Sequence, residues 1–433
     1  MAPESTEERL VWTALVWTYP LYFLGALYLS GPVVGWLLFL LFLGRFARGE
    51  QQQRIPLAVW LWCAGMLVML ISLVIGHVLN HLGTVQLIKS SIGWAKGWAL
   101  LAIFILAGTQ HIRPEILVRG AMHVCLHTLM LLPLFIGAWL LRLPETAYVS
   151  PIKMIGGPGP EFFAVSLYEI DPGSGLPRWR LFTPWAPALG FVANVFFLLS
   201  RLETDRFWRR SGVTASVMMI LMSQSRLALL ALIFMVGLLW AWRRLSAPAI
   251  AFCTAAGAFV FAFAGGWILE TLASSYDAIK AARADSTRVR ETLARIALQR
   301  WENEAPVWGH GVVERGPHLV EYMPIGSHHS WYGLLFVKGV VGLLALAIPM
   351  ACSVCALIRA GAALPCRVAA CCALLLFAYT FGENLEILAY LIWPGLIMIG
   401  VGHRLAAENR TKAAPNLPQL ARPCRQETLH GEA

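Results

Sequence analysis

Long apolar runs recur through most of this chain, and they limit its fold more than any other feature. One of them is IPLAVWLWCAGMLVMLISLVIGH, residues 55–77, which contains no Asp, Glu, Lys or Arg. A helix that crosses the apolar core of a bilayer, roughly 30 Å thick, needs about 20 such residues. Among the 433 residues, 58% are apolar and only 13% are charged, which is not the balance of a soluble domain. The sequence therefore predicts a polytopic membrane protein.

Twelve membrane spans result when the apolar runs are divided at charged residues and at clusters of Pro and Gly. They cover residues 10–29, 31–44, 55–77, 93–109, 120–141, 184–200, 211–224, 227–242, 247–268, 330–351, 366–382 and 386–402. The predicted fold class is all-α, an integral membrane protein of about 12 transmembrane helices with a large periplasmic loop between helices 9 and 10. The predicted organisation is helices 1–9 in residues 1–268 with a first external loop at 142–183, the large loop at 269–329, helices 10–12 in residues 330–403, and a disordered cytoplasmic tail at 404–433.

The basic residues indicate the direction of the spans. The net charge is +10, and short Arg-rich connections alternate with the two long loops. By the positive-inside rule the short connections are cytoplasmic, so both termini are expected in the cytoplasm and both long loops outside. Because topology accounts for the basic charge, we do not expect nucleic acid as a partner.

Residues 211–242 combine the apolar length of one helix with two basic flanks, DRFWRR and AWRR, that belong on the same side of the membrane. A helical hairpin satisfies both conditions, with its turn at MSQSR, residues 222–226. This turn brings Arg226 to the external edge of the bilayer, where a cation usually has a functional partner. The alternative is an arginine that only reaches the lipid headgroups.

Within the large loop, residues 287–303 have helical character. At 100° per residue, Val289, Leu293, Ile296 and Ala297 share one face, which we expect to pack on the membrane domain. Arginines lie on both flanks, Arg283 and Arg290 on one and Arg288 and Arg295 on the other, while Arg300 projects from the apolar face itself. Guanidinium groups bind phosphate oxygens in a bidentate manner, so this cluster suits an anionic headgroup. Ordinary phospholipid binding or a salt-bridged surface helix is the alternative.

Two adjacent histidines, His328 and His329, precede the apolar span at 330–351. A neutral imidazole accepts a proton at pH 7 without a shifted pKa, so either residue is a candidate general base. A headgroup contact is the alternative function. The carboxylates of the loop would need burial to become effective bases.

Four pieces of the sequence, in this order, resemble the O-antigen ligase and O-antigen polymerase (Wzy-type) superfamily of membrane glycosyltransferases. They are Ser223-Gln224-Ser225-Arg226 at a helix start, the Arg-bearing segment 288–300, the Pro-x-x-Gly-x-Gly of Pro306 to Gly311, and His328-His329 followed by Gly339 and Gly342. The resemblance puts the histidine of the family at His328, with His329 in a position usually taken by Asn or Ser. Glu383, in FGENLE, resembles an acidic position of the family.

The resemblance implies an enzyme of the bacterial inner membrane that acts on its periplasmic side. Such enzymes are inverting, metal-independent glycosyltransferases that need no cofactor and use an undecaprenyl-diphosphate-linked glycan as donor. His328 would be the general base, and Arg226, with Arg288 or Arg290 and with help from Arg300, would bind the diphosphate. Ser225, His329 and Glu383 would support the site.

The acceptor separates the two activities of this superfamily. A ligase transfers the glycan to lipid A core or another surface molecule, whereas a polymerase extends a second lipid-linked repeat; both serve O-antigen, capsule or exopolysaccharide assembly. The sequence leaves this choice open. A multi-span transporter or flippase of lipid-linked oligosaccharide is the alternative function, and it predicts pseudo-symmetric halves that are not visible in the sequence.

Overall fold

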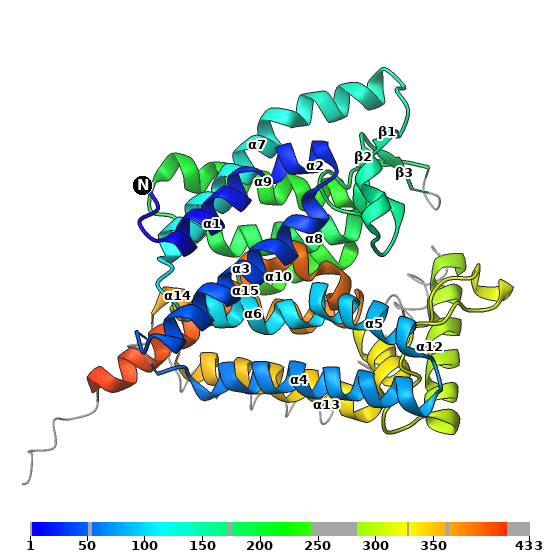
Figure 1. Cartoon of the computed structure of the whole chain (residues 1–433). Helices are drawn as coiled ribbons and strands as arrows, with labels where there is room; N and C mark the ends of the chain where they lie inside the picture. The colour runs from blue at the N-terminus through cyan, green and yellow to red at the C-terminus, as the bar shows by residue number, and fades with distance from the viewer. Residues whose placement is uncertain are drawn as a thin grey trace, which may run out of the picture.

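The computed structural model describes residues 2–50, 54–171, 175–244, 284–326, 329–360 and 363–413 (Figure 1). Most of them are helical. The helices are α1 (Thr6–Val16), α2 (Thr18–Leu24), α3 (Leu27–Ala47), α4 (Leu57–Leu79), α5 (Thr84–Lys96), α6 (Trp98–Gly108), α7 (Pro114–Leu140), α8 (Ala186–Ser200), α9 (Arg206–Ser223), α10 (Arg226–Arg244), α12 (Ala284–Glu304), α13 (Ser330–Arg359), α14 (Leu364–Tyr379) and α15 (Leu385–Ala413), with short 3-10 turns at Pro151–Ile155, Pro160–Phe163 and His318–Val320.

Seven stretches of helix within the described residues are long and apolar enough to cross a membrane. They are α3, α4, Thr84–Gly108 with α5 and α6 together, α7, α10, α13 and Leu385–Arg410 of α15, and α8 and α14 are shorter apolar helices. The prediction of a mostly helical, multi-pass membrane protein is confirmed. The predicted span at 247–268 lies outside the described residues, so the number of twelve spans stays a prediction.

The first predicted span, residues 10–29, is not one helix. The chain breaks at Trp17, between α1 and α2, and again at Gly25, which has φ +70°. A Cβ on Gly25 would lie 2.3 Å from Cβ of Ser150, because the first long loop packs against this turn. The prediction of a single span was wrong here, since the apolar composition does not reveal a contact with a segment more than 100 residues away.

The prediction of an all-α chain also misses four short strands in the first long loop. Strand β1 (Thr146–Val149) pairs antiparallel with β2 (Ala164–Ser166), and β3 (Glu169–Ile170) pairs with β4 (Pro177–Arg178). The Tyr22 hydroxyl accepts a hydrogen bond from the Ser166 amide and donates one to its carbonyl, which fixes this loop on α2. Strands of two to four residues are too short to leave a period in the sequence.

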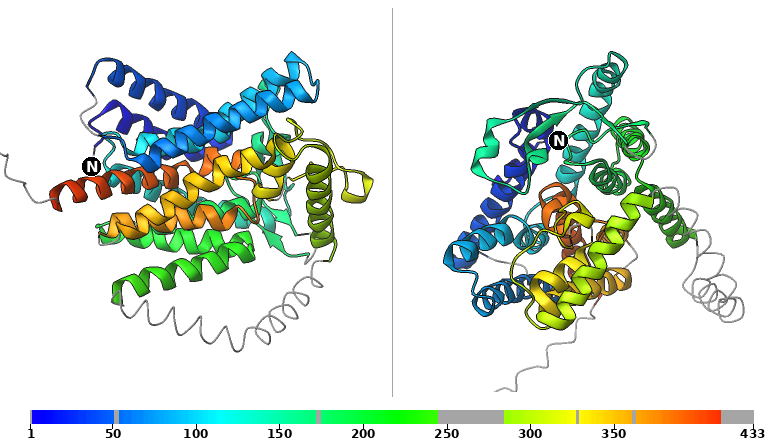
Figure 2. Two further views of the ribbon diagram at one scale, coloured as in Figure 1. Left: turned by 90° about the horizontal axis from the view of Figure 1, so that it is seen from below. Right: turned by 90° about the vertical axis from the view of Figure 1, so that its right-hand side faces the viewer.

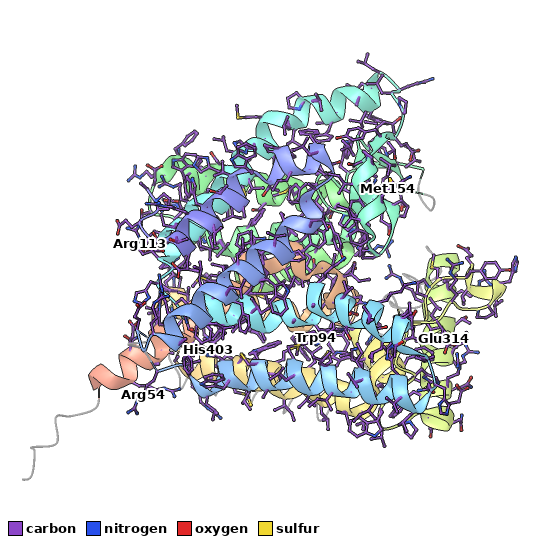
Figure 3. All side chains as sticks on the ribbon, viewed as in Figure 1. Arg54, Trp94, Arg113, Met154, Glu314 and His403 are labelled. Atoms are coloured by element: carbon purple, nitrogen blue, oxygen red, sulfur yellow. The ribbon has the colours of Figure 1, made fainter. Side chains whose placement is uncertain are left out.

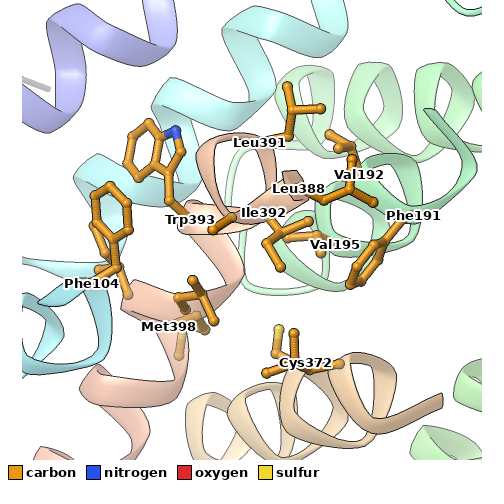
Figure 4. Packing of buried hydrophobic residues seen from close by; sticks show 14 of the residues in the cluster. Phe104, Phe191, Val192, Val195, Cys372, Leu388, Leu391, Ile392, Trp393 and Met398 are labelled. Carbon is orange, nitrogen blue, oxygen red and sulfur yellow. The ribbon is translucent and has the colours of Figure 1, made fainter. Parts of the chain in front are cut away.

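Helix α15 lies at the centre of the apolar core. In Figure 4 its side chains Leu388, Ile392 and Trp393 lie between the side chains of α8 and α6. Every residue of α6 is buried. Gly108 and Gly400 permit the close approach of α6 and α15. A Cβ on either residue would overlap a backbone carbonyl oxygen of the other helix. This packing holds the start of α15, and the loop before it, in a defined place.

The bundle has two distinct ends. The strands and α12 lie at one end, which we call the loop end, and α12 runs across this end roughly perpendicular to the other helices (Figures 1 and 2). Figure 3 shows Glu314 at the loop end and Arg113 at the opposite end. Arg113 binds Glu8, 2.8 Å between Nε and Oε1, and Arg404 donates to the carbonyl groups of Gln110 and Ile112. The first and last helices therefore meet at the same end, as the predicted topology requires, while the side of the membrane that it faces stays a prediction.

Helix α15 continues to Ala413, beyond residue 403 where the predicted tail begins. The contact of Arg404 with the chain before α7 stabilises this extension. Residues 404–413 are therefore helical rather than part of a disordered tail, and residues 414–433 lie outside the described residues.

Candidate active site

Helices α9 and α10 form the predicted hairpin, and its turn starts the site. Gln224 adopts the left-handed conformation, with φ 50°, and ends α9. The Ser223 hydroxyl accepts from the Ser225 amide at 3.2 Å, and the Ser225 hydroxyl accepts from the Ala228 amide at 3.3 Å, so Ser225 caps the start of α10. Arg226 is consequently the first residue of α10, and its side chain is exposed at the loop end. The four-residue motif thus builds a sharp turn that presents a guanidinium group.

The turn is fixed against α8. Nδ2 of Asn194 donates to the carbonyl oxygen of Ala228 at 3.0 Å, and a Cβ on Gly190 would lie 2.4 Å from Cβ of Ala228. On the other side, Nε2 of Gln224 donates to the carbonyl oxygen of Pro177 at 2.8 Å. Contacts from two elements therefore define where α10 begins.

Glu383, in the loop between α14 and α15, is the central carboxylate. Glu383 is only 5% exposed, and its Oε2 accepts a hydrogen bond from Nε1 of Trp185 at 3.0 Å. The hydroxyl of Ser330, the first residue of α13, donates to the Glu383 carbonyl at 2.7 Å and accepts from the Leu385 amide at 3.1 Å. The loop is in this way attached to the start of both α8 and α13.

The same loop touches the hairpin. A Cβ on Gly382 would lie 2.8 Å from Cδ2 of Leu227, the residue that follows Arg226. The structure therefore brings together the start of α8, the hairpin turn, the start of α13 and the loop with Glu383, four segments that are far apart in the sequence.

Burial raises the pKa of Glu383 to about 7, against the opposing effects of the Trp185 hydrogen bond and the positive charge of Arg290. Arg290, on α12, therefore acts on Glu383 across the loop end. Arg288 and Arg290 are both exposed, while Val289 between them is buried. Residues two apart on a helix point about 200° apart, so the two arginines lie on different sides of α12, and the charge of Arg290 acts on Glu383.

His329 lies beside this loop at the start of α13. Its ring accepts from the Tyr332 amide at 3.5 Å, stacks on the Tyr332 ring at 4.0 Å, and meets the Phe381 ring edge-on at 5.7 Å. Burial lowers the pKa of His329 to about 4, so its imidazole is neutral at pH 7. These contacts support a helix-capping role for His329. His328 lies outside the described residues.

The apolar face predicted for α12 is confirmed. Val289, Leu293 and Ala297 are buried against Phe336 and its neighbours, and Ile296 packs beside them. Arg300 lies on this face as predicted, with its guanidinium 5.1 Å from the centre of the Phe336 ring.

The guanidinium of Arg300 is engaged by two carboxylates. Nη2 lies 2.8 Å from Oε2 of Glu304, and Nη1 binds Glu314. His310, whose ring stacks on Phe336, adds a contact to Glu304 at 2.8 Å. Arg300 thus connects α12 to the chain that follows it, whereas Arg226 and Arg290 have exposed side chains at the loop end.

The glycine motifs of the sequence meet each other. Helix α13 is interrupted at Gly339, whose φ is +62°, and the amides of His310 and Gly311 donate to the carbonyl groups of Phe336 and Val337 at 2.8 and 2.9 Å. In return, the amide of Val340 donates to the Pro306 carbonyl at 3.0 Å. Both segments satisfy backbone groups that the helix break would otherwise leave unpaired inside the bundle. The two motifs are therefore one structural unit that fixes the large loop on α13.

Two participants were not identified from the sequence. Trp185 and Ser330 both contact Glu383. The only signal for Trp185 is its position before a Pro-containing helix start, TPWAP, and for Ser330 its position next to the histidines. Among the described residues, no group of three His, Cys, Asp or Glu side chains has the spacing of a metal site.

Residues 212–347 match the family model described as O-antigen ligase. This segment covers less than half of the chain, from α9 to α13, and it includes the hairpin turn, α12 and the two glycine motifs. Glu383 lies outside the matched segment but contacts Ser330 within it, and Trp185, which is also outside, contacts Glu383. No curated protein has a significant match to this chain.

Proposed function

We propose that the chain is a membrane glycosyltransferase of surface polysaccharide assembly, because residues 212–347 match the O-antigen ligase family model. The donor is an undecaprenyl-diphosphate-linked glycan, and the reaction takes place at the loop end, on the periplasmic side. The match agrees with the resemblance drawn from the sequence motifs. The observations that carry the proposal further are that the loop of Glu383 packs against Leu227, next to Arg226, and that the charge of Arg290 acts on Glu383.

In the proposed reaction, the acceptor hydroxyl attacks the anomeric carbon of the donor glycan from the face opposite the diphosphate. A new glycosidic C–O bond forms, the bond from the anomeric carbon to the diphosphate oxygen breaks, and the configuration inverts. The lipid diphosphate leaves with its negative charge, and the hydroxyl proton passes to a base of the protein. Stabilisation of the leaving diphosphate is the main electrostatic demand.

Arg226 and Arg290 meet this demand in our proposal. Both are exposed at the loop end, one on the hairpin turn and one on α12, and a guanidinium fork suits phosphate oxygens. Glu383 would orient Arg290 before the donor binds. Arg300, which is engaged by Glu304 and Glu314, would keep α12 in place rather than bind the donor. Arg288 would contribute only to the general positive charge.

His328 is the proposed general base, and Glu383 is the second candidate. A base functions best when its pKa lies near the working pH, and burial raises the pKa of Glu383 to about 7. Burial lowers the pKa of His329 to about 4, which makes it a weak base. No metal ion is required in this scheme, because arginines neutralise the leaving group.

The test is reconstitution of the purified chain in liposomes with a lipid-diphosphate glycan donor and either lipid A core or a second lipid-linked repeat as acceptor. We expect transfer in the presence of EDTA, and the productive acceptor separates ligase from polymerase. His328→Ala should lower transfer by 10²- to 10⁴-fold. Arg226→Lys, which keeps the positive charge but loses the bidentate fork, should also lower transfer, whereas equal activity would indicate that the charge alone is sufficient. If His328→Ala retained near-wild-type activity, Glu383 would be the general base instead of His328. Dependence of the reaction on added metal would contradict the arginine scheme.

A further inference from the structure

A pocket lies at the loop end, lined by residues that have no part in the proposed reaction. Its volume is about 280 Å³, and it opens between α4, α5, α13, the start of α15 and the chain after the second glycine of Gly-His-Gly. At about 30 Å³ per water molecule, this is room for a phosphate and its polar substituent. The polar lining consists of Gln86, Lys89, Ser90, Lys338 and Glu386.

Lys338 is the unusual member of this pocket. It belongs to the apolar helix α13 and is only 2% exposed. Glu386 is a charged group that acts on it. Burial of an ammonium group costs several kcal/mol unless a counter-charge compensates it. The helix break at Gly339, directly after Lys338, holds this side chain at the pocket wall.

The charges of the pocket favour an anion. Lys338 and Lys89 are both positive, and Glu386 is the single acidic group of the lining. The pocket lining therefore has two ammonium groups and one carboxylate, which gives it an excess of positive charge. A phosphate or another single anion would balance it.

Helix α5 indicates what kind of molecule carries that anion. Its polar residues Gln86, Lys89 and Ser90 face the pocket, whereas its apolar residues Val85 and Ile88 are 68% and 60% exposed. No residue of α5 is buried, although the helix is part of a candidate membrane span. Apolar side chains exposed in this way contact lipid chains in a membrane. The pocket and the helix beside it therefore suit an amphiphile.

We propose that this pocket binds the phosphate group of a membrane lipid, with Lys338 and Lys89 as its cationic contacts and the acyl or prenyl chains along Val85 and Ile88 of α5. The site is distinct from the arginines of the donor site. The lipid phosphate has two possible sources, a bulk phospholipid and, if the proposed function holds, the lipid-linked acceptor of the transfer reaction.

The test is native mass spectrometry of the purified full chain after exchange into phosphatidylcholine with and without phosphatidylglycerol, and in the absence of donor. We expect selective retention of phosphatidylglycerol by the wild type. Lys89→Gln, a substitution on an exposed residue, should weaken retention several-fold, and Lys338→Met should weaken it at least tenfold. Lys153→Gln is the matched control, because Lys153 is an exposed lysine of the first long loop that does not line the pocket.

Soluble glycerol phosphate should not displace the lipid, because the proposed contact with α5 requires the chains. Equal retention of phosphatidylglycerol by wild type, Lys89→Gln and Lys153→Gln would overturn the proposal, whether or not Lys338→Met folds. Displacement of phosphatidylglycerol by a lipid-linked acceptor identifies the acceptor as the ligand, and its absence identifies the bulk phospholipid. Because retention is measured without transfer, this outcome does not depend on the proposed enzyme activity.

Discussion

The indole N–H of Trp185 donates to the carboxylate of Glu383, with 3.0 Å between Nε1 and Oε2. This contact joins the start of α8 to the loop before α15, although 198 residues separate the two side chains in the sequence. The positive charge of Arg290 also lowers the pKa of Glu383, against the effect of burial. The carboxylate is therefore the point at which three parts of the chain meet, and most of the expectations below concern it.

Glu383→Gln should lower glycan transfer by at least about tenfold, because it removes the charge that faces Arg290 and keeps a group that accepts from Trp185. The pH profile of kcat/KM in the reconstituted assay is the sharper measurement. Wild-type activity should rise through about pH 7 as Glu383 loses its proton, and the variant should lack this limb. Glu302→Gln, on the exposed side of α12, is the control and should retain the wild-type profile.

The stability of the wild type should fall as the pH rises from about 4.5 to about 7. Over this range the folded chain retains a proton on Glu383, whose pKa is raised to about 7, while the unfolded chain, with the ordinary pKa of 4.5, has released it. The unfolded state therefore binds fewer protons, and the free energy of unfolding decreases by up to roughly 1.4 kcal/mol per pH unit. Thermal unfolding in detergent should show this slope for the wild type and a flatter one for Glu383→Gln; identical slopes would contradict the burial of an ionisable group at this position.

Arg290→Lys should reduce kcat/KM by about tenfold, the effect of losing one bidentate contact worth about 1.4 kcal/mol. Arg288→Lys is the matched control, since it makes the same change two residues away on another face of α12. In addition, Arg290→Gln should move the Glu383 limb of the pH profile to higher pH, because Arg290 opposes the rise of that pKa. If Arg288→Gln moved the limb equally, the assignment of Arg290 would be wrong.

Gly339→Ala should destabilise the chain by roughly 1–3 kcal/mol and should lower transfer, since Gly339 has φ +62° and a Cβ there would collide with the Val307 carbonyl oxygen. The substitution separates the large loop from α13. Gly237→Ala, in the middle of α10, provides the comparison, because nothing lies within 4 Å of a Cβ at that position. The thermal midpoint should fall for the first variant and stay equal or rise for the second.

Local patterns were sufficient for some parts of this structure. The apolar face of α12 was correct in its residues, because a helical period is contained within a single segment. The hairpin of α9 and α10 was predicted because its two basic flanks had to share one side of the membrane. In contrast, the predicted span at 10–29 was divided by a contact with Ser150, which no local pattern contains.

The sequence predicted several residues of the candidate site, but not how they are arranged in it. The motifs pointed to Arg226, Glu383, the α12 arginines and the adjacent histidines, but the patterns alone left Arg288 and Arg290 equivalent and assigned Arg300 to the donor. The structure distinguishes them by their partners, since Arg290 acts on Glu383 whereas Arg300 binds Glu304 and Glu314.

The sequence by itself determined that this chain has the composition of a multi-pass membrane protein and a segment, residues 212–347, that matches the O-antigen ligase family, because composition and motif order are properties of the chain. The tertiary structure decided the environment of Glu383 and the break of α13 at Gly339. The physical reason is that a raised pKa requires burial, and an interrupted helix requires partners for its free backbone groups. At Glu383 and Gly339 these conditions come from Trp185 and from residues 306–311, whose contacts exist only in the folded chain.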